Sequence, residues 1–323
     1  MQTFNVYLAA ATAITALAAP TSYAQTPYPN KPIRILSGSP PGAPSDLVAR
    51  ILAEKLGKQF KQPVIVENRT GASNGLAAQH VSKAAPDGYT LLVTPDTTIA
   101  VNPLLYKSMD FDPRIELTPV SLLASFNQMM VCNAALKITS MKELTARAKQ
   151  SELTYASGGQ GSPGHLAAEL FLQGSGIKMN HIPYKGPGPA LTDVMGGQVD
   201  CGFLTTPTVL PHVKTGRLTA LAVSSSTPSP MAPTVPTLPQ VGLPDIDGSF
   251  NQYLFTPTGT PQPVVDTLQK AVLEILKDQD VRDKLMSLDL TPIETTSEQA
   301  RSRLKQDTEK WTAVVKRIDM TPQ

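Results

Sequence analysis

The stretch YASGGQGSPGHLAAELF, residues 155–171, joins a strand-like run to a helical pattern through a glycine-rich loop. From Gly159 onward the loop spells G-x-G-x-x-G, as a dinucleotide-binding turn does. Such a turn also needs an acidic residue about 20 residues later, at the end of the next strand. The next expected strand, residues 179–184, runs into HIPYKG (residues 181–186), which has no Asp or Glu. The sequence therefore argues against a nicotinamide cofactor, and we expect no cofactor of any kind.

The same loop suits a different anion. Glycine lets main-chain N–H groups approach a ligand closely, and Pro163 fits a first helical turn because an N–H there would be unpaired. The remaining free N–H groups and the helix dipole favour negative charge. Ser157 and Ser162 add hydroxyl donors. An anion held in this way requires neither a metal nor a fixed cation.

This construction recurs at further junctions between an expected strand and an expected helix. A single loop rich in Gly, Ser and Pro is an ordinary connection. Several such loops at equivalent strand ends are typical of one shared anion site, although the alternative that only two or three contact the ligand stays open. The further loops are residues 38–46, 71–75, 184–188 and 205–207.

Short apolar runs alternate with helical patterns along the chain, which predicts two α/β units with mostly parallel sheets. Open sheets of this kind bind ligands beyond the carboxyl ends of their strands, so two facing units form a cleft. The final strand and two terminal helices are expected to return to the first unit. The expected strands are 33–36, 64–67 and 90–94 in the first unit, 129–132, 154–157, 179–184, 201–204 and 218–223 in the second, and 252–255 on return.

Composition and the N-terminus indicate an exported protein. The 323-residue chain has 17% charged residues and a net charge of +2, which creates no strong field toward nucleic acid. Residues 1–24 resemble a signal peptide, because the run 6–19 is apolar and Ser22 and Ala24 are spaced like a cleavage site. That run is roughly 14 residues long, whereas a membrane span needs about 20. Residues 1–5 lack Lys and Arg, so a lipid-facing N-terminal anchor is the alternative.

Cysteine and histidine spacing predicts no metal site. Cys132 and Cys201 lack the spacing of metal ligands. An oxidising compartment permits a disulfide between them, while their strand-like positions are those of buried free thiols, which we favour. The histidines form no close pair with metal spacing. His165, in the first turn after the glycine-rich loop, is expected to support that loop, and Lys185 is expected to be exposed.

Long ordered segments resemble one protein family. They include YPNKPIRIL (residues 28–36), VIVENRTGASNGLAAQHVSKAAPDGYTLL (64–92) and HIPYKGPGPALTDVMGGQVD (181–200). These are similar to the periplasmic solute-binding proteins of tripartite tricarboxylate transporters, the TctC or Bug family. The resemblance implies a monomeric, non-catalytic two-domain Venus-flytrap that captures an organic acid, often a dicarboxylate, and passes it to membrane permease subunits. The implied parts are a signal peptide (1–24), a first domain (25–125 and 252–323) and a second domain (126–251).

The resemblance also implies which residues hold the ligand. In the family, loops after the strands of both domains bind a carboxylate through main-chain and hydroxyl hydrogen bonds. Carried over, the first-domain residues are Ser39, Pro41, Ser73, Asn74, Thr94 and Asp96, and the second-domain residues are Ser157, Gly158, Gly161, Ser162, Tyr184 and Thr205.

Two departures from the family pattern bear on the ligand. Pro40 and Pro41 stand where glycines are common, which removes main-chain donors from the first loop. Phe250 stands where the family often has Trp or Tyr, and Phe126 lies near the outgoing crossover. Both rings would stack on a flat acid such as terephthalate if they flank the cleft. The alternative is that they are hinge or core residues.

Two other functions remain to be weighed. A serine hydrolase needs a G-x-S-x-G elbow, but Gln160 stands where the first glycine before Ser162 belongs. A triad assembled in space is not excluded, yet nothing in the sequence requires one. A receptor that senses a solute for a signalling partner has the same sequence features as a transport protein. We therefore expect a secreted binding protein for a small carboxylate, with transport or sensing as its role.

Overall fold

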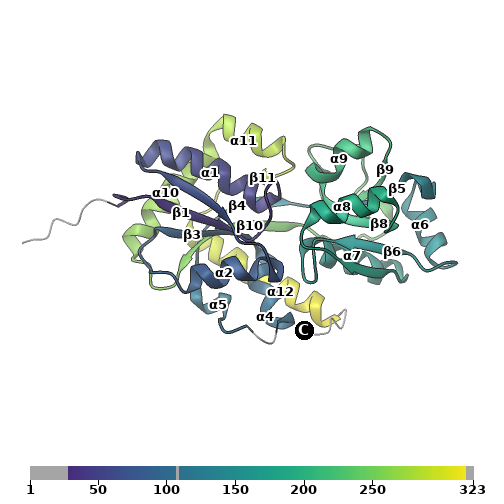
Figure 1. Ribbon diagram of the computed structural model, residues 1–323, viewed down its shortest axis with the longest axis horizontal. Coiled ribbons are helices and arrows are strands. Elements are labelled where there is room, and N and C mark those ends of the chain that lie inside the picture. The colour runs from purple at the N-terminus through teal and green to yellow at the C-terminus, as the bar shows by residue number, and fades with distance from the viewer. Residues whose placement is uncertain (1–27, 107–108, 318–323) are drawn as a thin grey trace, which may run out of the picture.

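The computed structural model describes residues 28–106 and 109–317, and its strands form two separate sheets (Figure 1). The expected signal peptide, residues 1–24, lies outside the described residues. We call the six-stranded sheet and its helices the first lobe, and the five-stranded sheet and its helices the second lobe. Strand order is β11-β4-β10-β3-β1-β2 in the first lobe and β7-β6-β8-β5-β9 in the second. The expected α/β architecture with two sheets and flanking helices is confirmed.

The first lobe uses both ends of the chain. Its elements are β1 (Ile33–Ser37), α1 (Pro44–Phe60), β2 (Val64–Asn68), the 3-10 turn η1 (Ala72–Asn74), α2 (Gly75–Ser82), β3 (Thr90–Pro95), α3 (Asp96–Ala100), α4 (Asn102–Leu105), α5 (Pro113–Glu116), β4 (Leu117–Phe126), β10 (Phe250–Pro257), α10 (Gln262–Lys277), α11 (Gln279–Met286), β11 (Thr291–Pro292) and α12 (Ser297–Arg317).

The second lobe is built from the middle of the chain. Its elements are β5 (Gln128–Asn133), η2 (Ala134–Leu136), α6 (Met141–Ala148), β6 (Thr154–Ser157), α7 (Pro163–Ser175), β7 (Asn180–Pro183), α8 (Pro187–Gly196), β8 (Cys201–Thr205), α9 (Thr206–Lys214), β9 (Leu218–Val223) and η3 (Pro239–Val241).

Helix α1 shows how the apolar pattern positions the first loop. Val48, Ile51, Leu52 and Leu56 recur at helical spacing, and all four are buried. Burying each such side chain contributes about 1.5–3 kcal/mol relative to leaving it exposed. This face fixes α1 over the sheet, so the start of the helix stays at the carboxyl end of β1.

Both sheets carry more antiparallel pairing than expected. β1 pairs with β2 and β3 in parallel, as predicted, but β10 runs antiparallel to both of its neighbours, β3 and β4. In the second lobe, β5 is antiparallel to β8 and β9. The reason is connectivity, because β4 leaves the first lobe directly into β5 and β10 brings the chain back.

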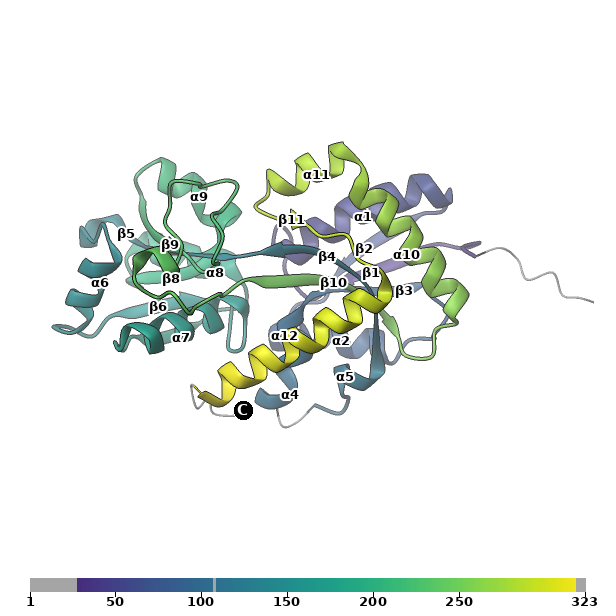
Figure 2. The ribbon, with the colours of Figure 1, turned by 180° about the vertical axis from the view of Figure 1, so that it is seen from behind.

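Strand β4 was not predicted from the sequence. Pro119 lies inside it, and proline in a central strand lacks the N–H needed for pairing. The structure accommodates Pro119 opposite Phe255, next to a shift in the β4–β10 register. Strands β4 and β10 lie side by side and lead from the first lobe toward the second (Figures 1 and 2).

Helix α12 extends along the first lobe toward the second (Figure 2). It is the last of the two terminal helices expected from the sequence, although the polar sequence from Ser297 to Lys310 conceals where it begins. Trp311 is fully buried and stacks on Phe250, with ring centroids 4.6 Å apart and planes 1° from parallel.

No helix in the described part of the chain has both the length and the apolar character needed to cross a bilayer.

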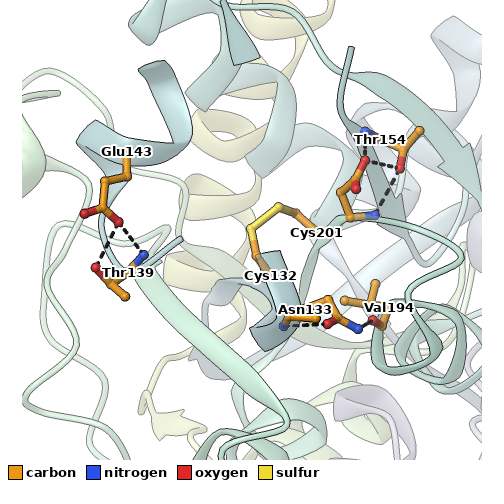
Figure 3. The surroundings of a disulfide bond; sticks show 9 residues. Cys132, Asn133, Thr139, Glu143, Thr154, Val194 and Cys201 are labelled. Carbon is orange, nitrogen blue, oxygen red and sulfur yellow. Dashed lines mark hydrogen bonds between the residues drawn. A yellow bond between two sulfur atoms is a disulfide. The ribbon is translucent and has the colours of Figure 1, made fainter. Parts of the chain in front are cut away.

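The cysteines form a disulfide, so the free-thiol interpretation is wrong (Figure 3). Cys132 in β5 and Cys201 in β8 stand directly opposite each other in the antiparallel register. Asn133, beside the bond, donates from Nδ2 to the Val194 carbonyl at 2.8 Å. The sequence alone did not show that β5 and β8 are neighbours, because 69 positions separate the two cysteines.

Candidate functional site

A cavity of about 480 Å³ lies between the lobes, and residues of both lobes form its wall. Cavities of 300–1,000 Å³ are typical of small-molecule sites. The wall comes mainly from the loops that follow β1, β2, β6 and β7, which are strand-to-helix loops predicted to bind an anion, and from the end of β8. Of the expected site residues, the wall includes Ser39, Ser73, Asn74, Gly158, Ser162, Tyr184 and Thr205.

Three expected first-lobe residues lie elsewhere. Pro41 is exposed on the loop, and its neighbour Pro40 takes the place in the wall. Thr94 is buried and exchanges a 2.7 Å hydrogen bond with the Thr98 hydroxyl. Asp96 is fully buried, where its carboxylate accepts hydrogen bonds from Trp311 Nε1 at 3.0 Å and from its neighbour's main-chain N–H. The Thr94 and Asp96 side chains therefore support the first lobe rather than face the cavity.

Three expected second-lobe and hinge residues also lie outside the wall. Ser157 is fully buried under its loop. Gly161 is buried, and its N–H donates to His165 Nδ1 at 3.0 Å. Phe250 is fully buried between Phe126, at 5.6 Å, and α12. Phe250 is therefore a core residue, while Phe126 does reach the wall.

Sequence reasoning missed several wall residues. Gln128 and Gln252 lie at the two crossings between the lobes, and Tyr106 follows α4. Nothing in their local sequence indicates a binding role, because only the packing of distant strands brings them to the cavity. Their position beside the predicted crossovers was the one available signal.

The start of α1 lies in the cavity wall and leaves few main-chain donors for a ligand. Its N-cap, Ala43, has no side-chain capping bond, and Pro44 occupies the first turn. The first N–H groups of a helix have no partner within the helix. Ala43, Pro44 and Ser45 all lie in the wall, but the Ala43 N–H donates to the Pro40 carbonyl at 3.2 Å and Pro44 has no N–H. Ser45 is therefore the wall residue of this turn whose N–H has no hydrogen-bond partner in the described chain. Asp46 directs its carboxylate away, toward the Gly42 N–H at 2.9 Å and Arg50 Nε at 3.0 Å.

The loop before α2 has an unusual backbone. Ala72, Ser73 and Asn74 have φ values of 44°, 46° and 71°, a left-handed conformation that costs roughly 1–3 kcal/mol at a non-glycine residue. Asn102 Nδ2 holds the loop by donating to the Ala72 and Ser73 carbonyls at 3.1 and 3.0 Å. Ser39 Oγ donates to Asn74 Oδ1 at 2.8 Å. The surrounding contacts thus maintain a strained turn in the cavity wall.

A stack of three rings supports the loop before α7. The rings of His165 and His181 lie 4.0 Å apart and 9° from parallel, and Tyr155 stacks on His181 at 4.8 Å. His181 Nε2 shares a 2.7 Å hydrogen bond with Ser157 Oγ. Burial, followed by the nearby His181, lowers the pKa of His165 to about 3, and burial lowers the pKa of His181 to about 4. Both rings are neutral at pH 7, so they position the loop without adding charge.

The wall carries little fixed charge. Among the described residues that form it, Lys185 is the one charged at pH 7, and its side chain is exposed as expected. The Tyr184 hydroxyl donates to Asp193 at 2.5 Å, and burial together with this bond raises the pKa of Tyr184 to about 12. The Tyr184 hydroxyl therefore holds its loop to helix α8 through Asp193. An anion in this cavity would meet main-chain and side-chain dipoles rather than an ion pair.

The lobes touch through residues of the cavity wall. Ser73 Oγ donates to the Gln160 carbonyl at 2.5 Å, and the Tyr106 hydroxyl donates to the same oxygen at 3.3 Å. Gly186 packs so closely on Pro40 that a Cβ there would lie 2.8 Å from the Pro40 Cγ. The two lobes are therefore in direct contact beside the cavity.

A family comparison identifies the chain. The model of the tripartite tricarboxylate transporter family receptor, TctC, matches residues 48–320. The chain belongs to the TctC family. Protein BugT of Bordetella pertussis is 36% identical to this TctC protein over 303 residues, which cover 93% of this chain and 92% of BugT.

Solved structures agree with this assignment. Rpa4515 from R. palustris, solved with adipate, is 28% identical, with a TM-score of 0.87 over 92% of this chain and 100% of its own. MatC from Rhodopseudomonas palustris, solved with bound malate, is 29% identical, with a TM-score of 0.81 over 89% of this chain and 100% of its own. Each of these two structures is therefore similar to this chain along its whole length.

Proposed function

We propose that this TctC protein is a periplasmic solute-binding protein that captures a small organic carboxylate between its lobes. The observation that carries the proposal is the cavity itself, which is lined by helix starts and glycine-rich loops and has no carboxylate in its described wall. Helix N-termini bind anions through free N–H groups and the helix dipole. Two structural neighbours, solved with adipate and with malate, support an organic acid as the ligand.

The size and lining of the cavity suit a small acid, including a flat aromatic one. Its volume of about 480 Å³ suits a compact acid. Phe126 and Tyr106 are among the wall residues, and aromatic side chains stack favourably on a flat ligand. Terephthalate therefore belongs in the ligand set beside adipate, malate and citrate.

The proposed role is delivery of the acid to membrane permease subunits after export through an N-terminal signal peptide. The family's description as a transporter receptor supports this role. Sensing for a signalling partner is the alternative. Deleting the gene separates them, because transport predicts lost uptake of the acid, while sensing predicts lost induction with uptake intact.

Titration calorimetry and thermal shift with a panel of acids test the binding function. A ligand at 100 times its dissociation constant should stabilise the protein by about 2.7 kcal/mol. We expect at least one carboxylate to bind with this effect. The absence of binding by succinate, malate, adipate, citrate, benzoate and terephthalate would contradict the proposal.

A hydrolase is disfavoured by the position of the one serine–histidine pair that the described residues bring together. Ser157 lies 2.7 Å from His181 Nε2, as a nucleophile lies from its base, but Ser157 is fully buried and absent from the cavity wall. A nucleophile has to reach the substrate. Chromogenic esters should therefore not be turned over, and serine-dependent turnover would overturn the binding function.

A further inference from the structure

Gln128 places an unpaired carboxamide in the cavity wall. It begins β5, and its backbone is fully engaged, since its N–H donates to Ser224 Oγ at 2.9 Å and its carbonyl accepts from the Ser224 N–H at 2.8 Å. Only 3% of the residue is exposed. Its side-chain nitrogen and oxygen make no hydrogen bond to any described residue, although they border the cavity.

Gln252 presents a donor from the opposite crossing. It lies in β10 and is 1% exposed. Ser45 Oγ donates to its Oε1 at 2.9 Å, which fixes the orientation of the amide. The Gln252 Nε2 group, a donor only, is then left without an acceptor within the described chain. A ligand group that satisfies it has to be a hydrogen-bond acceptor.

These two amides constrain what fills the cavity. Buried polar groups are almost always hydrogen-bonded, and leaving one unpaired costs free energy. Water meets this need while the cavity is wet. A ligand that displaces the water has to replace its hydrogen bonds or lose affinity. An apolar tail cannot do so, whereas a carboxylate can accept from Gln252 Nε2 and from the Gln128 amide, and the described wall has no carboxylate that would pair with an ammonium group.

We infer that Gln128 and Gln252 form a second polar subsite, which accepts the far carboxylate of a two-ended acid and rejects monocarboxylates with an apolar tail. The inference rests on the proposed function, in which the helix starts and glycine-rich loops hold the first carboxylate. The two glutamines stand at the crossings between the lobes, so a two-ended acid bridges the loops and the hinge.

Matched pairs of acids test this selectivity on the wild-type protein. The pairs are succinate with butyrate, adipate with hexanoate, and terephthalate with 4-methylbenzoate, each differing by one carboxylate. Titration calorimetry at one pH should show the diacid of at least one pair binding about ten- to a hundredfold more tightly, because a site built for hydrogen bonds discriminates against ligands that lack them. Equal affinity within every pair that binds would overturn the inference while leaving carboxylate binding intact.

Variants test whether the Gln128 and Gln252 side chains cause the selectivity for diacids. Gln128→Leu and Gln252→Leu should each weaken the diacid about tenfold and leave the monoacid unchanged or tighter. Gln128→Glu should weaken the diacid more than Gln128→Leu does, because it adds a negative charge beside the second carboxylate. Monoacid binding by each variant shows that it is folded, so the diacid-to-monoacid ratio is the readout.

Gln198→Leu is the matched control, because Gln198 is exposed between α8 and β8 and lies outside the wall. Its selectivity should equal that of wild type. Selectivity that persists in both Leu variants at the cavity would overturn the inference. If no acid binds the wild-type protein, the proposed function fails first and the subsite fails with it.

Discussion

Gly186 lies where the lobes touch, and its lack of a side chain is required there. Its φ is +109°, and a Cβ would meet the Pro40 Cγ of the other lobe at 2.8 Å. Gly186→Ala should therefore hinder closure and lower ligand affinity at least tenfold, which corresponds to about 1.4 kcal/mol. Calorimetry with the best acid of the panel measures the effect.

Variants of two other glycines distinguish an effect on contact between the lobes from an effect of backbone strain. Gly242 has a similar φ of +97° but open space around it, and Gly188 has open space without a positive φ. Gly242→Ala should lower the melting temperature without changing affinity, and Gly188→Ala should change neither. An affinity loss in Gly242→Ala equal to that in Gly186→Ala would show that strain, rather than contact between lobes, is responsible.

Single residues also mark the limit of the sequence-based prediction. The loops with Ser73, Asn74 and Ser162 were predicted from their Gly, Ser and Pro content, and the structure brings them to one cavity. Gln128 and Gln252 were not predicted, because a glutamine in a strand has no local sign of function. Their role depends on which strands cross between the lobes, and that is a property of the tertiary structure.

At the scale of elements, the His165–His181 stack fixes the loop that opens α7. His165→Phe keeps a ring in the stack but removes the Nδ1 acceptor of the Gly161 N–H, which leaves a buried donor unpaired. We expect the folded protein to be about 1–3 kcal/mol less stable and its ligand binding to be weaker. His165→Asn offers an oxygen near the Nδ1 position but no ring.

Comparing the two histidine variants distinguishes positioning from packing. If the hydrogen bond positions the loop, His165→Asn should bind ligand more tightly than His165→Phe, even where its melting temperature is lower. Affinities that simply follow melting temperature in the two variants would reduce the role of His165 to core packing.

Elements were predicted well where the apolar period was clear and poorly where it was interrupted. Strands β6 and β9 and the start of α7 were predicted at their observed positions. Pro119 concealed β4, and the polar first half of α12 concealed its start at Ser297. In both cases tertiary packing overrides the local signal, since β4 pairs with β10 and α12 is anchored by buried Trp311.

At the scale of the whole molecule, Asp96 in α3 forms hydrogen bonds to residues of β10 and α12 beside the crossing between the lobes. Its carboxylate accepts from Trp311 Nε1 and from the Asn251 N–H, at 3.0 and 3.3 Å. Burial and the nearby Asp307 raise the pKa of Asp96 to about 8. Because the pKa is higher in the folded state, this group's stabilising contribution is complete below about pH 4 and is lost as pH rises toward 8.

Denaturant unfolding of Asp96→Asn across pH 4–9 checks this direction. The stability of wild type relative to the variant should fall with rising pH, by up to about 1.4 kcal/mol per pH unit, and level off above pH 8. Trp311 fluorescence reports the unfolding of this region directly. A difference that stays constant, or that grows with pH, would mean that Asp96 is ionised in the folded protein.

The Cys132–Cys201 bond makes a covalent ring of the segment that carries the second-lobe cavity loops. Exposed Lys185 lies inside that ring. A protease that cuts once beside Lys185 therefore releases no fragment, and the nick becomes visible on a gel only after reduction. A gel run under oxidising conditions would consequently overlook a severed ligand loop, so preparations used for affinity measurements need a reduced sample as well.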